Sequence, residues 1–331
     1  MKIRASIGTA VALGLETTKI DVLPTTAYLM MNAPNHCLSN CSFCPQARES
    51  SGKADKLSRV IWPLYELEDI LAKLLKIKHG LKRLCIQTVQ FTDSNENLLE
   101  MLTIIKSNKL SLPISVCSYP VGKKIFEQMK ELGVSRVGIS FDCATEKIFD
   151  KVKGKKRGNT LTWRILEKAI DDAADVFGDR FVSTHLIIGL GETEEEAIKF
   201  IQKFYDRKIT TGLFAFTPVQ GTDLEKHPKP MMDSYRRIQL AKYLIEQGKT
   251  TYKQMTFQTI LGKKKQLVHL GLEKESIEQV IRTGKAFETS GCSHCNRPFY
   301  NESPGKELFN FPKTLTIQEI NSILEEFKEF L

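Results

Sequence analysis

The chain lacks any apolar run long enough to cross a membrane, and its first residues lack the apolar core of a signal peptide. We therefore expect a cytoplasmic protein that does not insert into membranes. Two basic runs, 153–157 and 263–265, contain no interleaved aromatic residues, so the sequence does not favour nucleic acid as a partner. No low-complexity linker interrupts the 331 residues, which suffice for one large domain or two average ones.

The overall composition is that of an ordinary globular protein, with 41% hydrophobic and 26% charged residues. The net charge of +9 indicates either ordinary solubility or attraction to an acidic partner. Eight cysteines would suit disulfides in a secreted chain. Because no export signal is evident, metal or iron–sulfur binding is the favoured interpretation.

Three cysteines are closely spaced as Cys37-x3-Cys41-x2-Cys44, directly after an apolar run at 27–31. Three such thiolates can hold three irons of a [4Fe-4S] cluster, which leaves the fourth iron open to a small molecule. A zinc site usually needs a second cysteine or histidine pair, and a ferredoxin needs a fourth cysteine nearby. The next cysteine is Cys85, so the spacing favours an open-site cluster.

Strand-like and helix-like segments alternate through the first 250 residues and predict an α/β protein with a parallel sheet and helices outside. The expected strands are 26–33, 82–90, 112–119, 134–142, 180–189 and 210–217. The expected helices are 64–78, with an apolar stripe from Leu64 to Leu75, then 94–108, 121–132, 160–176, 193–206 and 233–247. Thr193 and Glu196 form a capping box at the start of the fifth helix. Six βα units fit either an open doubly wound sheet or a barrel with fewer than eight units.

The alternation stops near residue 250. We expect residues 1–250 to form the βα body and 251–331 to form a C-terminal extension. The extension has expected helices at 273–283 and 316–330, separated by an irregular stretch, 289–302, that carries Cys292 and Cys295. A Cys-x2-Cys pair is half of a metal site or a redox pair, so it needs partners from elsewhere in the chain.

Cys37, Cys41 and Cys44, with aromatic Phe43 before the last cysteine, resemble the signature of the radical S-adenosylmethionine (SAM) superfamily. The resemblance implies a [4Fe-4S] cluster whose free iron chelates SAM. An electron from a ferredoxin- or flavodoxin-type donor would cleave SAM to methionine and a hydrogen-abstracting 5′-deoxyadenosyl radical. The resemblance also favours a partial (β/α)6 TIM-type barrel, in which the functional residues lie at the C-terminal ends of the strands.

The expected strands two to six most resemble biotin synthase and its relatives. In that family, cysteines on strands two, three and five hold a second cluster that is consumed as a sulfur source. Cys85 and Cys117 match the first two positions, although each is also a candidate for plain burial. The third position is Ser183 or a neighbour. That ligand set is therefore incomplete.

We expect the C-terminal pair to complete this second site. Cys292 and Cys295, joined by Cys85 and Cys117, would make an all-cysteine [4Fe-4S] site if the extension folded back to close the barrel mouth. Cys143, at the end of the fourth strand, is a reserve candidate or a packed core residue.

The resemblance also implies SAM contacts. Phe43 would face the adenine, Ser140 and Asp142 would lie near the ribose, and Arg157 or Arg164 would pair with the SAM carboxylate. The strand-five residues expected near the adenine are Ile188, Gly189 and Glu192. The Gly-Gly-Glu-like motif that holds the SAM amine in many members is missing after the second strand, where Thr88, Gln90 or backbone carbonyls are the substitutes.

The cysteine tail at 289–302 and the residues 40–48 resemble the two-component lipoyl synthases. This implies sulfur insertion at C6 or C8 of an octanoyl-lysine on a lipoyl domain or a glycine-cleavage H-type carrier protein, together with a second radical SAM component. Acidic carriers would suit the net charge. The alternatives are a biotin synthase-like sulfurtransferase on another substrate, a mutase or lyase of the methylornithine-synthase or hydrogenase-maturation type, and an iron–sulfur protein without radical chemistry.

Overall fold

The computed structural model describes residues 1–76, 80–259, 265–298, 300–302 and 307–331. Its centre is an eight-stranded sheet in the order β10-β9-β8-β7-β6-β2-β1-β5. The six predicted strands are confirmed and pair in parallel as neighbours. They are β2 (Thr26–Met31), β6 (Arg83–Gln87), β7 (Ile114–Ser118), β8 (Val134–Ile139), β9 (Val182–Ile188) and β10 (Thr210–Ala215).

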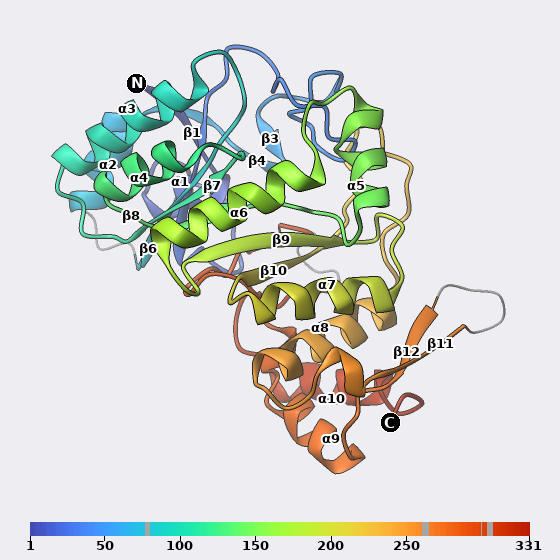
Figure 1. Ribbon diagram of the computed structural model, residues 1–331. Helices are drawn as coiled ribbons and strands as arrows, with labels where there is room; N and C mark the ends of the chain where they lie inside the picture. The colour runs from blue at the N-terminus through green and yellow to red at the C-terminus, as the bar shows by residue number, and fades with distance from the viewer. Residues whose placement is uncertain (77–79, 260–264, 299, 303–306) are drawn as a thin grey trace.

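Helices connect these strands and cover the outer face of the sheet (Figure 1). They are α2 (Leu67–Lys76), α3 (Ser94–Ser107), α4 (Lys123–Glu131), α5 (Glu146–Val152), the 3₁₀ turn η1 (Lys155–Arg157), α6 (Trp163–Phe177), α7 (Glu194–Asp206) and α8 (Met232–Glu246). The predicted capping box is present, because Thr193 and Glu196 each accept a hydrogen bond from the other's backbone. The arrangement is the expected partial (β/α)6 barrel, and none of the described helices is long and apolar enough to span a membrane.

The N-terminal edge of the sheet differs from the prediction. Two antiparallel strands, β1 (Lys2–Ala5) and β5 (Leu64–Glu66), extend the sheet beyond β2. The predicted helix at 64–78 therefore begins only at Leu67, and its apolar stripe is shorter than expected. Leu64 and Leu75 are exposed, whereas Leu67, Ile70, Leu71 and Leu74 are buried. Short elements α1 (Ile7–Ala12), β3 (Lys56–Leu57) and β4 (Val60–Ile61) complete this region.

The C-terminal extension begins after α8, and its helices gather on the side of α7 and α8, away from α2 and α3 (Figure 1). It contains the 3₁₀ turns η2 (Tyr252–Gln254) and η3 (Lys285–Phe287), the hairpin β11 (Thr256–Thr259)–β12 (Lys265–His269), α9 (Lys274–Arg282) and α10 (Ile317–Glu326). Of the predicted basic run at 263–265, only Lys265 lies within the described residues, and it pairs with Glu195.

The cysteine-bearing tail leaves this extension and returns to the barrel. At the N-terminal end of β2, Thr25 N–H donates to Asn296 Oδ1 at 3.0 Å. Along β10, Leu213 N–H donates to Ser290 Oγ at 3.0 Å, and Asn301 Nδ2 donates to the Ala215 carbonyl at 2.8 Å. The tail thus lies between the first and last parallel strands, which do not pair with each other.

This position corrects the expectation that the tail closes the barrel mouth. The segment with Cys292 and Cys295 meets the N-terminal ends of the strands, where Arg83 Nε also donates to the Ser293 carbonyl at 3.3 Å. Only its end reaches the opposite side, where Thr217 donates to the Asn301 carbonyl at 3.0 Å. The physical reason is the gap between β10 and β2, which six strands cannot close and the tail fills.

Candidate functional site

The interior of the partial barrel holds a cavity of about 290 Å³. Its lining comes from all six parallel strands, the loop after β2 and the returning tail. Seven of the eight cysteines line it: Cys37, Cys41, Cys44, Cys85, Cys117, Cys292 and Cys295. The structure therefore brings both predicted cysteine sets into one chamber.

The loop after β2 folds its three cysteines inward through short backbone bonds. Cys37 N–H donates to the Gln46 carbonyl at 2.7 Å, and Cys44 N–H donates to the Cys41 carbonyl at 3.1 Å. Gln90 N–H reaches Cys37 Sγ at 3.4 Å. Burial raises the pKa of Cys41 to about 12 and also raises that of Cys44. Bound iron reverses this penalty because it stabilises the thiolate, so the donor set suits a cluster.

The second set joins two strands to the tail. Cys85 on β6 and Cys117 on β7 lie on neighbouring strands. A hydrogen bond between the two sulfurs raises the pKa of Cys85 and lowers the pKa of Cys117. In the tail, Cys295 N–H donates to the Cys292 carbonyl at 3.1 Å, which curls the pair into one turn. The charges of Cys292 and Cys295 also raise the pKa of Cys85, so all four thiols lie close to one another.

Among the described residues, no group of three or more Cys, His, Asp or Glu side chains is close enough to hold a single metal ion. This does not argue against a cluster, because a [4Fe-4S] cube spreads its thiolates over four corners, whereas zinc gathers them around one point. The reserve candidate Cys143 is fully buried in the main core and does not line the cavity.

Three of the predicted SAM contacts, Phe43, Ser140 and Asp142, line the cavity. Asp142 has a left-handed backbone, with φ of 64°, in the turn that follows β8. Its carboxylate accepts from Lys153 Nζ at 2.6 Å, and Lys153 Nζ also donates to the Ser140 carbonyl at 2.6 Å. The sequence pattern indicates Lys153 only as part of a basic run, whereas the structure places it inside the chamber.

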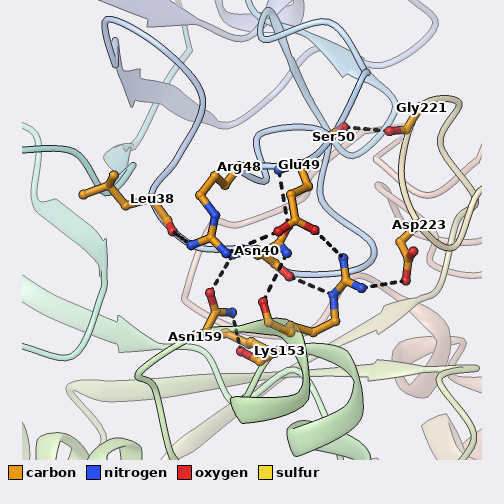
Figure 2. Close-up of polar contacts among 10 residues, drawn as sticks. Leu38, Asn40, Arg48, Glu49, Ser50, Lys153, Asn159, Gly221 and Asp223 are labelled. Atoms are coloured by element: carbon orange, nitrogen blue, oxygen red, sulfur yellow. Dashed lines mark hydrogen bonds and ion pairs between the residues drawn. The ribbon is translucent and has the colours of Figure 1, made fainter.

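The two arginines predicted for the SAM carboxylate do not line this cavity. Arg164 is exposed on α6. Arg157 pairs with Asp223 at 3.3 Å and Glu49 at 3.8 Å, and its Nε donates to the Asn40 carbonyl at 3.2 Å. Figure 2 shows Asn40, Glu49 and Asp223 gathered in this network. Arg157 lines a second cavity of about 250 Å³, which Cys41 and Cys44 also line. Of Lys153 and Arg157, Lys153 is the one that lines the chamber with both cysteine sets.

Three further predicted contacts, Ile188, Gly189 and Glu192, are not among the residues that line the cavity. The Glu192 carboxylate accepts from the backbone N–H groups of Gly189 and Leu190, at 2.6 and 3.1 Å, and so closes the turn after β9. Gly189 has φ of +107°, and a Cβ there would lie 2.9 Å from Pro230 Cδ. These residues shape the end of β9, whose Ile187 lines the chamber.

The proposed amine contacts Thr88 and Gln90 line the cavity, as does Thr217 after β10. Among the lining residues that no sequence motif indicates are His185 and Trp62. His185 lies two residues after Ser183, so it shares the inward face of β9, and the period-two alternation of a strand was the available clue. Trp62 follows β4 and is completely buried.

A family model of the radical SAM superfamily matches residues 31–204, which is more than half of the chain. The chain belongs to the radical SAM superfamily. Membership implies a [4Fe-4S] cluster and SAM. Cys37, Cys41 and Cys44 line the cavity together, and three thiolates are the donor set that such a cluster needs.

Sequence relatives include a biotin synthase from Streptococcus agalactiae serotype III, which is 25% identical over 199 residues. The match covers 58% of this chain and 55% of the relative, so the chain spans little more than half of that protein's length. An uncharacterized protein from Methanocaldococcus jannaschii is 24% identical over 167 residues, which cover 49% of this chain and 42% of that protein.

The solved structures similar to this chain share its fold at low sequence identity. Methylornithine synthase superposes with a TM-score of 0.51 and 17% identity, covering 65% of this chain and 60% of that one. The [FeFe]-hydrogenase maturase from Carboxydothermus hydrogenoformans has a TM-score of 0.51 and 17% identity, covering 73% and 60%. These likenesses support the partial barrel and leave the reaction to be argued from the site.

Proposed function

We propose that this radical SAM enzyme inserts sulfur into an unreactive carbon, as a lipoyl synthase component acting on a protein-bound octanoyl-lysine. The observation that carries the proposal is the placing of Cys85, Cys117, Cys292 and Cys295 in the same cavity as the radical SAM cysteines. A radical mutase or lyase needs no second cysteine set beside the first. A sulfur-inserting enzyme needs a sulfur source within reach of the carbon that loses its hydrogen.

When bound, a cluster on Cys37, Cys41 and Cys44 with SAM would supply the hydrogen-abstracting radical, and a cluster on the second set would supply sulfur. The chain's own residues hold and orient these groups. Phe43 and Asp142 line the wall nearest the first set, where a carboxylate accepts two ribose hydroxyls well. Lys153 supplies the positive charge suited to the SAM carboxylate.

The apolar part of the cavity suits an alkyl substrate. A small hydrophobic cluster, separate from the main core, includes Cys85 of the second set and packs against Cys37 of the first. Its buried members are Tyr28, Met30, Trp62, Cys85 and Val89. Each methylene of an alkyl chain buried against such a wall contributes about 0.8 kcal/mol, so an octanoyl chain has enough length to be held by this surface.

The partners in this proposal follow from the chemistry. The substrate is carried on an octanoylated lipoyl domain or an H-type carrier protein, and the second sulfur is inserted by a second radical SAM component. A ferredoxin- or flavodoxin-type protein supplies electrons. The net charge of +9 would attract acidic carriers, and ionic strength would weaken the encounter.

The test is turnover of an octanoylated carrier with anaerobically purified protein that holds both clusters. With SAM and a low-potential reductant, we expect 5′-deoxyadenosine and a carrier that has gained one sulfur in intact mass. The double variant Cys292→Ala/Cys295→Ala should still cleave SAM but yield no sulfur-containing product. Cys143→Ala is the matched control, because Cys143 is buried outside the cavity.

SAM cleavage without thiolated carrier, alone and with the second component, would contradict the octanoyl assignment. The similarity to biotin synthases favours sulfur insertion into another substrate as the second candidate. A mutase or lyase would keep full turnover of its own substrate in the Cys292→Ala/Cys295→Ala variant.

A further inference from the structure

A histidine lies beside the second cysteine set. His185 projects from β9 into the cavity, and its Nε2 lies 3.9 Å from Cys117 Sγ, within range for a hydrogen bond to sulfur. Its Nδ1 lies 2.7 Å from Ser140 Oγ. The ring also packs edge-on against Phe214 of β10, with centroids 4.9 Å apart. Contacts on three sides hold the imidazole in one orientation.

With a cluster bound to Cys117, these contacts would define which nitrogen carries the proton. A metal-bound thiolate only accepts hydrogen bonds, so Nε2 would donate to Cys117. In a neutral imidazole Nδ1 is then the acceptor, and the Ser140 hydroxyl is free to donate to it. Gly212 lies next to the ring, and a Cβ there would make an ordinary van der Waals contact with His185 Cδ2 at 3.4 Å.

Two other sulfurs of the set meet donors from the barrel wall in the same way. Gln87 Nε2 donates to Cys85 Sγ at 3.1 Å. Tyr28 accepts from Arg297 N–H at 3.1 Å, which leaves its hydroxyl proton for Cys295 Sγ at 3.4 Å. His185 is therefore one of three donors that each meet a different sulfur of the second set.

We propose that His185 is the strand-five residue of the second cluster site and acts by donating a hydrogen bond from Nε2 to the Cys117 sulfur. The inference rests on the second cluster of the proposed function. His185 is a positioning residue, not an iron ligand, because the four cysteines already supply one ligand for each iron of a [4Fe-4S] cluster. Hydrogen bonds to the sulfurs of a cluster stabilise its more negative reduced state and so raise its reduction potential.

The test isolates the second cluster in the full chain with Cys37→Ser, Cys41→Ser and Cys44→Ser. In this background, iron and sulfide are counted after anaerobic reconstitution, and the midpoint potential is measured by EPR-monitored redox titration. We expect His185→Leu to bind as much iron as the background but to have a lower midpoint potential. His185→Gln, which keeps a donor, should recover part of the difference. His269→Leu is the control, since His269 is exposed on β12.

Ser140→Ala removes the partner that fixes the ring, and we expect a smaller decrease in the same direction. It provides a test even if His185→Leu fails to fold. An unchanged potential in His185→Leu, or in both Ser140→Ala and His185→Gln if the leucine variant is unfolded, would overturn the inference. Loss of iron in both His185 variants would overturn it in favour of direct ligation. Failure of the cysteine-to-serine background itself to bind iron would instead overturn the second cluster, and with it the proposed function.

Discussion

Lys153 Nζ lies 2.6 Å from Asp142 Oδ2, and both side chains are only 10% exposed. Burial alone would lower the pKa of Lys153, but the charge of Asp142 and the neighbouring Cys41 raise it above its ordinary value. A raised lysine pKa means that the pair's stabilisation is complete below the ordinary lysine pKa and is lost as pH rises through the folded-state value. At neutral pH the pair is therefore fully formed at the wall of the radical SAM chamber.

We expect Lys153→Met to reduce the free energy of unfolding by about 3–5 kcal/mol, because it leaves a buried carboxylate without its partner. The double variant Lys153→Met/Asp142→Asn should recover part of this loss, since it removes the unpaired charge. Urea unfolding of the metal-free full chain measures the free energy of unfolding of both variants. Lys168→Met is the control, because its pair with Asp172 is at the surface and contributes less than about 1 kcal/mol.

If Lys153→Met and the double variant lost the same free energy of unfolding, packing and not charge would stabilise the turn after β8. SAM binding provides a separate measurement. We expect the affinity of the folded Lys153→Met protein for SAM to fall, whereas Arg164→Met, on the exposed face of α6, should leave it unchanged.

The sequence predicts the parallel core of this fold because its signals are local. A strand buried on both faces reads as a continuous apolar run, and β2, from Thr26 to Met31, is buried at every position. The antiparallel edge carries a weaker signal. Leu64 begins β5 and is 43% exposed, so its apolar character suggests a helix stripe that begins earlier than the one in the structure, which starts at Leu67.

The residues of the site also differ in how well the sequence predicts them. Cys37, Cys41 and Cys44 are neighbours in sequence, so their spacing alone predicts that they act together. The direction of a single side chain depends on the register of strands and turns. Lys153 enters the chamber and Arg157, four residues later, faces the other cavity, although both belong to one basic run. No local pattern distinguishes them.

Iron content should separate the two cysteine sets. We expect about eight irons per chain in the anaerobically reconstituted protein and about four in Cys292→Ala/Cys295→Ala, because the proposed function assigns one [4Fe-4S] cluster to each set. Mössbauer spectroscopy measures the cluster type and its amount. Cys143→Ala should keep about eight irons, since Cys143 lies in the core. Four irons in the unmodified protein, with no change in the double variant, would restrict the chain to a single cluster.

Asn296 anchors the cysteine tail to the barrel. Its Oδ1 accepts from Thr25 N–H, and its Nδ2 donates to the Leu23 carbonyl, both at 3.0 Å. Asn296→Ala leaves these groups without their partners and should cost the tail about 1–3 kcal/mol of local stability. Hydrogen exchange should then become faster at 290–297 while β6 and β7 keep their protection.

The control for the tail variant is Asn108→Ala, at the exposed end of α3, which should leave exchange at 290–297 unchanged. Unchanged exchange in Asn296→Ala would mean that the tail is held by its other contacts. Among these is the Arg297 guanidinium, whose central carbon lies 3.8 Å from the centre of the Phe214 ring.

Gly138 on β8 sets the space around the second cysteine set. A Cβ at this position would lie 3.0 Å from Ser183 Oγ and 3.5 Å from Cys117 Sγ. Gly138→Ala should therefore crowd the Ser183 hydroxyl and lower the free energy of unfolding by about 1–3 kcal/mol.

Ser183→Ala removes that hydroxyl, so the double variant should be more stable than the sum of the single changes predicts. Urea unfolding of the four proteins measures this coupling, and Gly122→Ala, which would meet no atom within 4 Å, is the control. Strict additivity would show that the strand shifts freely and that Gly138 is not needed for close packing at this site.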